Sequence, residues 1–236
     1  MNVHRMRQIE WRSPRRGGWL SWLAFLLGVG LAAPSARPGL AAPPPHAEAT
    51  EAMAADRLDE ARALLEAPAA AGDAEALHLL GVVAVRQDRP DDALALLERA
   101  AASRPDSAET HYWLGVALDD KRRTVSRIFQ LEWARRMREA WERAVGIDPD
   151  HASAHDALVH FHAEAPKIAG GDPAKARYHA RELARLRPVD GNLRLASLQR
   201  ADGDLVATAE SLELARNSGG GAHLVGVVIS LLVEAG

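Results

Sequence analysis

The chain has 236 residues, of which 47% are hydrophobic, 26% are charged and only 5% are aromatic. Its abundance of alanine, leucine, glutamate and arginine is typical of a globular, helical protein and argues against a long β-sandwich. Cysteine is absent, which excludes a disulfide framework, a thiolate metal site, a cysteine nucleophile and a lipid-modified cysteine.

The formal net charge of −3 conceals an asymmetry along the chain. Residues 1–42 contain six arginines and one glutamate, a charge of +5, so the remaining residues together carry −8. A protein that binds nucleic acid needs a basic surface to neutralise phosphates. The acidic body therefore argues against nucleic acid as a partner.

The N-terminal segment, residues 1–42, has the layout of a signal peptide followed by the start of a proline-rich linker. Arginines precede an apolar run of 15 residues, Trp19–Ala33, after which small residues offer cleavage sites following Ala32 or Ala41. A membrane-spanning helix usually needs about 20 apolar residues. We therefore expect cleavage and a periplasmic or otherwise exported protein. The alternative is a protein that stays anchored in the membrane by residues 19–33.

Residues 74–107 carry the spacing of a repeat built from two helices. The shared feature is a set of small and apolar residues, ending in a proline, at fixed distances: Leu77, Leu80, Gly81, Ala84, Ala93, Leu97, Ala100 and Pro105. This spacing resembles the tetratricopeptide-repeat (TPR) family, with the family's aromatic positions replaced by leucine and alanine. The resemblance implies an all-α fold, a TPR-like α-solenoid of antiparallel helix hairpins, in which Gly81 and Ala93 allow two helices to cross closely.

Further copies of the repeat follow with insertions. Residues 108–151 read as a repeat with a ten-residue insertion, and residues 152–190 as one with a five-residue insertion, where Asp172 and Pro173 are expected to begin a helix. The flanks are weaker: 43–73 is a partial repeat, 191–217 a degenerate hairpin, and 218–236 a glycine linker with an apolar terminal segment. We expect Leu224–Val233 to pack on the preceding hairpin. The insertions are similar to those of exported bacterial TPR proteins of unassigned function.

The TPR resemblance also implies a binding groove, lined at fixed positions by the first helix of each hairpin. Those positions hold Glu75, His78, Val82, Arg86, Glu109, Tyr112, Val116, Asp119, Asp120, Asp156, His160 and Glu164. Six carboxylates and one arginine predict an acidic groove for a basic or amphipathic peptide. TPR domains that clamp a C-terminal carboxylate use lysine and asparagine instead, so that mode is rejected. The alternative is that these carboxylates simply solvate the helix surface.

The ten-residue insertion combines basic and apolar residues, including Arg127, Ile128, Phe129 and Leu131. Such a mixture is compatible with contact to an anionic membrane surface. We favour a simpler interpretation, a lengthened helix pair whose Trp133 and neighbouring apolar residues, Met137 and Trp141, lie in the core while its arginines face water.

Catalytic motifs, a metal site and a cofactor site are not predicted. The only candidate metal cluster, His151, His155, His160 and His162, is spread over positions that point in different directions in the repeat. The serines lack a nucleophile elbow, and the glycines match no phosphate-binding pattern.

The sequence therefore predicts a non-enzymatic scaffold or adaptor in the bacterial cell envelope that binds another protein or peptide. The alternative is a membrane-surface-associated TPR protein held by its N-terminal segment and the basic insertion. Neither the partner's identity nor the oligomeric state follows from the sequence.

Overall fold

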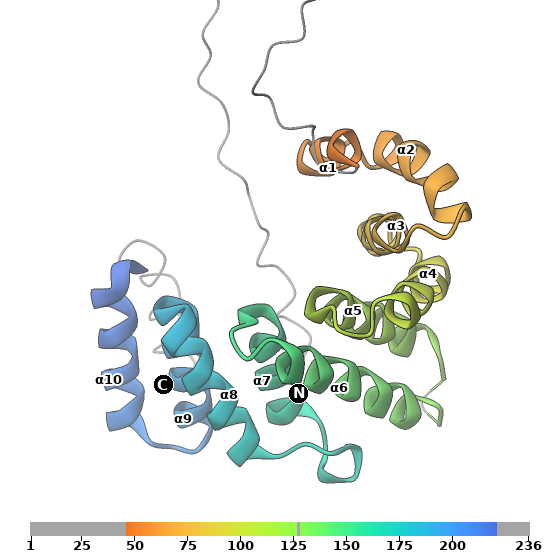
Figure 1. Cartoon of the computed structure of the whole chain (residues 1–236). Coiled ribbons are helices and arrows are strands. Elements are labelled where there is room, and N and C mark those ends of the chain that lie inside the picture. Colours follow the sequence, from red (N-terminus) through yellow and green to blue (C-terminus); the bar gives the residue numbers. More distant parts are fainter. Residues whose placement is uncertain (1–45, 127, 221–236) are drawn as a thin grey trace, which may run out of the picture. The chain divides into compact units, whose positions relative to one another are not determined.

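The computed structural model describes residues 46–126 and 128–220 (Figure 1). The chain divides into two units, and the described residues all belong to the second, Pro43–Gly236. The predicted signal peptide, Arg127 and the apolar segment Leu224–Val233 lie outside the described residues. The described residues form helices and turns, with no β-strand among them.

The helices follow one another in chain order with short connections. They are α1 (Ala47–Ala54), α2 (Leu58–Ala70), α3 (Ala74–Arg86), α4 (Pro90–Ser103), α5 (Ala108–Thr124), α6 (Gln130–Ile147), α7 (Ala152–Glu164), α8 (Pro173–Leu186), α9 (Pro188–Ala201) and α10 (Leu205–Ala215). Two short helices, η1 (Lys167–Ala169) and η2 (Arg216–Gly220), precede α8 and follow α10.

Each helix packs against the helix before it and the helix after it, so that the chain forms a row of helix hairpins (Figure 1). Two pairs of odd-numbered helices, α3 with α5 and α7 with α9, also contact each other directly. This arrangement confirms the expected all-α solenoid of helix hairpins, and it makes the odd-numbered members the first helices of their hairpins.

Side-chain caps fix where several helices begin. The Asp172 carboxylate accepts hydrogen bonds from the backbone N–H groups of Ala174 and Lys175, at 2.8 and 3.4 Å, and Pro173 occupies the first position of α8. A proline is well suited to this position because its missing N–H has no partner there in any helix. The predicted helix start at Asp172 and Pro173 is confirmed.

Small residues allow the two helices of a hairpin to approach closely. A Cβ atom added to Gly81 would lie 2.6 Å from Cγ of Leu97, and the same addition to Gly115 would collide with the indole of Trp141. Ala93 is completely buried in the first of these hairpins. The packing reason proposed for Gly81 and Ala93 from the repeat pattern is therefore confirmed.

The ten-residue insertion lengthens both helices of its hairpin. α5 has 17 residues and α6 has 18, whereas α3 and α4 have 13 and 14. Met137 and Trp141 are buried on α6, and Trp133 is half-buried against the same core. The insertion thus forms the longer helix pair that the sequence analysis favoured. No helix in the described part of the chain is both long and apolar enough for a membrane span.

Candidate functional site

The twelve residues predicted to line the groove lie on three first helices, and the surface that they outline is named the first-helix face. Four of them are on α3, five on α5 and three on α7. α3 and α5 contact each other. A hydrogen bond between Glu109 of α5 and His151, which precedes α7, joins the next pair. The structure therefore places the predicted residues on adjoining helices.

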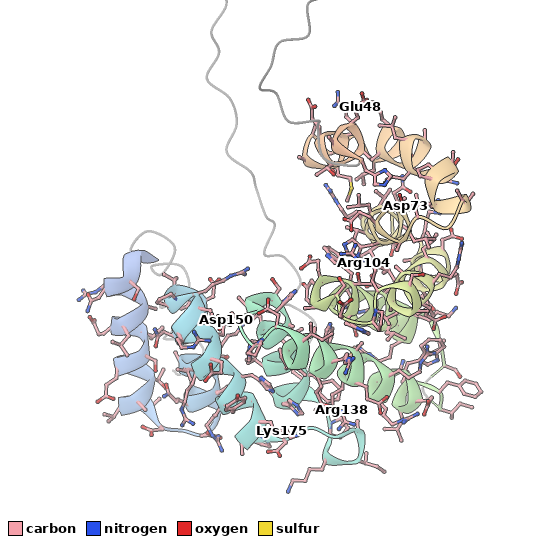
Figure 2. The ribbon with its side chains drawn as sticks, viewed as in Figure 1. Glu48, Asp73, Arg104, Arg138, Asp150 and Lys175 are labelled. Carbon is pink, nitrogen blue, oxygen red and sulfur yellow. The ribbon has the colours of Figure 1, made fainter. Side chains whose placement is uncertain are left out.

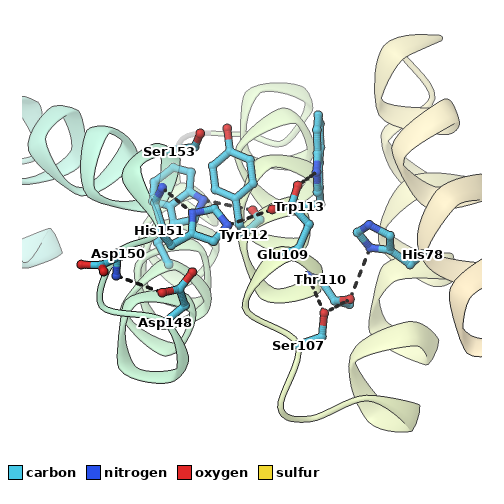
Figure 3. Close-up of polar contacts among 12 residues, drawn as sticks. His78, Ser107, Glu109, Thr110, Tyr112, Trp113, Asp148, Asp150, His151 and Ser153 are labelled. Atoms are coloured by element: carbon cyan, nitrogen blue, oxygen red, sulfur yellow. Dashed lines mark hydrogen bonds and ion pairs between the residues drawn. The ribbon is translucent and has the colours of Figure 1, made fainter. Parts of the chain in front are cut away.

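Two of these residues are buried rather than open on the first-helix face. Val82 is 5% exposed and belongs to the hydrophobic core. His78 is 6% exposed, and its Nδ1 lies 3.3 Å from the hydroxyl of Thr110, which donates to Ser107 (Figure 3). Burial lowers the pKa of His78 and keeps its ring neutral at pH 7. His78 thus contacts α5, and Val82 lies in the core formed mainly by α1, α2 and α3, so neither side chain is open to a ligand.

Two carboxylates of the first-helix face are neutralised by arginines that lie outside the predicted set. Glu75 forms an ion pair with Arg104, the residue that follows α4 and is labelled in Figure 2. Asp156 accepts two hydrogen bonds from the guanidinium of Arg194 on α9, at 2.7 and 3.2 Å. A two-point contact of this kind is the strongest form of arginine–carboxylate pairing. These two positions contribute little net charge to the face.

A third carboxylate, Asp119, is also paired, whereas its neighbour Asp120 is held less firmly. Asp119 accepts a hydrogen bond from Arg122 at 2.7 Å and forms a second ion pair with Arg123. Asp120 reaches Arg123 only at 3.6 Å. Burial raises the pKa of Asp120, and the carboxylates of Asp119 and Asp88 raise it further. Asp120 is therefore the carboxylate at this end of the face that gains most from a cationic ligand.

Glu109 is held by ring nitrogens and not by a cation. The indole N–H of Trp113 donates to Oε1 at 2.8 Å, and Nε2 of His151 donates to Oε2 at 2.9 Å (Figure 3). The bond from His151 is the main cause that lowers the pKa of Glu109, so this carboxylate is ionised at pH 7. Tyr112 is half-buried beside it, and its ring lies 5.1 Å from that of His151.

The other predicted residues are distributed along the same helices. Arg86 is turned toward the preceding hairpin, where it donates to Asp56 at 2.9 Å. His160 and Glu164 are exposed on α7, with 3.7 Å between Nδ1 and the carboxylate. Val116 is half-buried. Because Arg86 contacts the chain itself, the open part of the face lies on α5 and α7.

Comparisons with known proteins address the fold. No known family model matches the chain, and neither does any curated protein. Solved structures do match. The protein TTC0263, a thermophilic TPR protein of Thermus thermophilus, has a TM-score of 0.62 at 19% identity, with 79% of this chain and 96% of that chain covered. MamA has a TM-score of 0.56 at 18% identity, with 72% and 93% covered.

A third solved structure, YrrB, is described as a TPR protein with an unusual peptide-binding site. Its TM-score is 0.56 at 16% identity, and the match covers 80% of this chain and 92% of that chain. The chain has the TPR fold. In that fold the register of the repeat assigns groove positions on the first helices alone. The sequence analysis therefore missed His151 and Arg104, which lie between helices, and Arg194, which lies on the degenerate hairpin. It also missed Trp113, which is on α5 but next to a groove position and not at one.

The histidines of α7 are separated by the TPR packing. His151 contacts Glu109, and His160 lies beside Glu164. His155 and His162 point into the interface with α8 instead. Among residues 46–126 and 128–220, no group of three or more histidine, aspartate and glutamate side chains is arranged to hold a metal ion.

The turn that joins the lengthened helices α5 and α6 exposes large apolar side chains. Ile128 is 81% exposed, and Phe129 and Leu131 are also exposed. The arginine nearest this turn on α6 is paired, since Arg135 donates hydrogen bonds to Glu132 and Glu139. Among the described residues, this part of the chain is apolar at its tip, and Arg135 beside the tip is paired with carboxylates.

Proposed function

We propose that this chain is a non-enzymatic TPR scaffold that binds a basic or amphipathic peptide segment of another protein on its first-helix face. The observation that carries the proposal is the open surface of α5, where half-buried Tyr112 and Val116 lie on the same helix as the carboxylates of Glu109 and Asp120. An apolar strip bordered by anionic groups suits an amphipathic segment with basic residues.

The TPR fold supports this proposal because its hairpins present a long row of first helices to a ligand. YrrB, which shares the fold, is described as having a peptide-binding site. The internal pairs of Glu75 and Asp156 leave fewer free carboxylates than the sequence suggested. Specificity for basic segments therefore rests on Glu109, Asp120 and Glu164.

The test uses a fluorescent helical peptide of lysine and leucine, compared with a peptide in which glutamate replaces lysine. Fluorescence anisotropy is expected to show binding of the lysine peptide alone, weakening with added salt. The double variant Asp120→Asn, Glu164→Lys is expected to bind about tenfold more weakly, since a few charges on a binding surface shift affinity by this order.

The matched control is Glu210→Lys, which changes an exposed carboxylate on α10, away from the first-helix face. It is expected to bind like the unmodified chain. Asp119 and Asp156 are avoided because reversing their charge would break internal pairs and mix unfolding with lost binding. Equal binding of both peptides, or unchanged binding by the double variant, would show that the first-helix face does not select ligands by their positive charge.

The proposed location is the bacterial cell envelope, after removal of the signal peptide. Support comes from the sequence of residues 1–42, an arginine-rich start followed by a short apolar run. Osmotic shock of cells that express the full chain should release a shortened protein. Full-length protein in the membrane pellet would instead favour anchoring by residues 19–33.

A second candidate function is contact with the membrane surface, which the exposed Ile128, Phe129 and Leu131 favour specifically. Sedimentation with vesicles that contain anionic lipid tests it. Binding that disappears when Ile128 and Phe129 are both changed to serine would support this function. Binding that persists in the double variant would assign membrane contact to another part of the chain.

A further inference from the structure

Glu109 differs from the paired carboxylates of the first-helix face in the nature of its partners. Glu75, Asp119 and Asp156 each form an ion pair with arginine. Glu109 accepts hydrogen bonds from two ring N–H groups, and no lysine or arginine in the described part of the chain forms an ion pair with it. Its side chain is 58% exposed. The carboxylate is thus oriented and accessible, and its charge is not balanced by an arginine.

The position of His151 at the start of α7 determines which of its ring nitrogens faces Glu109. Nδ1 of His151 accepts the backbone N–H of Ala154 at 3.1 Å and so caps the helix. A nitrogen that accepts a hydrogen bond carries no proton, so the proton resides on Nε2, which donates to Glu109 at 2.9 Å. Both bonds fit the neutral tautomer.

Two aromatic rings flank this carboxylate on the same side of α5. Tyr112 and Trp113 follow Glu109 by three and four residues, a spacing that places side chains next to one another on a helix. The two rings meet edge to face at 5.5 Å, and both are half-buried (Figure 3). Burial raises the pKa of Tyr112, with added contributions from Glu109 and Asp156, so its hydroxyl stays protonated. The ring is therefore a neutral surface beside a negative charge.

We infer that Glu109, Tyr112 and Trp113 form a subsite for a cationic side chain of the bound segment, either the ammonium of lysine or the guanidinium of arginine. The carboxylate pairs with the cation while an aromatic face lies against it, a combination of ion pairing and cation–π attraction. The inference deepens the proposed function and rests on its assignment of the ligand to the first-helix face.

The experiment titrates the full chain, labelled with nitrogen-15, with three small probes. They are the N-acetyl methylamides of lysine, arginine and norleucine, and the last has a similar side chain without charge. The reporter is the indole N–H signal of Trp113, assigned by its loss in Trp113→Phe. A saturable shift with lysine, arginine or both, and none with norleucine, is expected. The two cationic probes separate the two possible sources of positive charge.

Variants at the subsite then locate the binding. Glu109→Gln keeps an acceptor oxygen but removes the charge, and we expect affinity for the cationic probe to fall about fivefold, the order of an exposed ion pair. Tyr112→Leu removes the aromatic face and is expected to weaken binding about threefold. Tyr112→Phe keeps the ring and should retain the affinity that Tyr112→Leu loses. The control Glu210→Gln, at an exposed carboxylate on α10, should bind like the unmodified chain.

A shift by norleucine equal to that by lysine, undiminished binding in Glu109→Gln, or no saturable shift at all would overturn the subsite. If Glu109→Gln proves misfolded by its amide spectrum, Tyr112→Leu and the salt dependence of the unmodified chain decide instead. Binding of the lysine–leucine peptide without a response at Trp113 would remove the subsite and leave the proposed function intact. If the lysine–leucine peptide does not bind but the cationic probes do, the subsite stands and the proposed binding of a peptide segment is wrong.

Discussion

At the scale of single residues, Gly115 marks a point where two helices touch. Gly115 on α5 faces the indole of Trp141, and the indole N–H donates to the carbonyl of Tyr112 at 3.2 Å. A side chain at position 115 would push the ring away and break this hydrogen bond. Gly146 on α6 has no neighbouring atom within 4 Å of an added Cβ. The two glycines therefore differ in what surrounds them, a closed interface in one case and open space in the other.

We expect Gly115→Ala to lower the free energy of unfolding by about 1–3 kcal/mol, because the added methyl group overfills a closed interface. Gly146→Ala is expected to raise it by about 0.5–1 kcal/mol, because alanine favours the helix and meets no clash. Urea denaturation of both variants measures the difference. If Gly115→Ala leaves the free energy of unfolding unchanged, Trp141 has room to move away from the added methyl group.

At the scale of elements, the α7–α8 hairpin is joined by three buried histidines. His155 donates from Nε2 to the carbonyl of Pro149 at 3.0 Å. Its Nδ1 lies 3.0 Å from Nδ1 of His179, and one of these two nitrogens donates to the other. The ring of His162 stacks on that of His179 with 5.9 Å between centroids. Nδ1 of His162 donates to Gly170, which leaves its buried Nε2 without a partner. The three rings therefore lie in a closely packed interface, where burial disfavours the charged form of His179 and His162.

Burial, together with smaller contributions from His155, His162 and Lys175, lowers the pKa of His179 from its usual 6.5 to about 4. Burial is also the largest cause that lowers the pKa of His162, with Lys175 and Arg138 in the same direction. The Gly170 carbonyl and Glu142 oppose this effect on His162. The interface of α7 and α8 is thus sensitive to acid.

The sign of the pH effect follows from which state binds the proton. Below pH 6.5 the unfolded chain protonates His179 while the folded chain does not, so stability is complete above that pH and falls as pH drops toward 4. Between pH 7 and pH 5, protonation of His179 in the unfolded chain should lower the free energy of unfolding by about 2 kcal/mol. Urea denaturation at pH 7 and at pH 5 should show that His179→Leu loses less free energy of unfolding on acidification than the unmodified chain.

His160→Gln provides the control for this prediction, because His160 is on the same helix as His155 and His162 but is exposed. It should lose as much stability on acidification as the unmodified chain. Equal pH dependence in His179→Leu and the unmodified chain would mean that His179 is not held neutral by its surroundings.

At the scale of the whole molecule, packing in the described part of the chain is local along the sequence. Helices contact their neighbours in the chain, with α3–α5 and α7–α9 as the longer steps. In repeat proteins stability is approximately a sum of such neighbouring contacts, so a local defect loosens nearby hairpins first.

We therefore expect Gly115→Ala to increase amide hydrogen exchange most in α4, α5 and α6. The increase should be smaller in α1 and α10, which are distant from the altered hairpin along the row of helices. Hydrogen exchange followed by mass spectrometry measures the pattern. A uniform increase over all ten α-helices of the described residues would indicate a single cooperative unit and contradict this expectation.

Repeat spacing was enough to predict the hairpins because each position in the pattern has a local cause. Gly81 is opposed by Leu97 of the same hairpin, and Asp172 caps the helix that begins beside it. Contacts of this kind involve residues close in sequence. The candidate face was harder to predict, since Arg194 reaches Asp156 from 38 residues away and Arg104 reaches Glu75 from 29.

The sequence by itself determined the all-α repeat architecture, because helix periodicity, small residues at crossings and helix-capping residues all act over a few residues. It also indicated the helices that carry the candidate face. The tertiary structure decided which of those side chains are free. It buried His78 and Val82, gave Glu75 and Asp156 arginine partners, and left Glu109 held by two ring N–H groups. Net charge at a surface depends on every group that folding brings near it, and those groups come from distant parts of the chain.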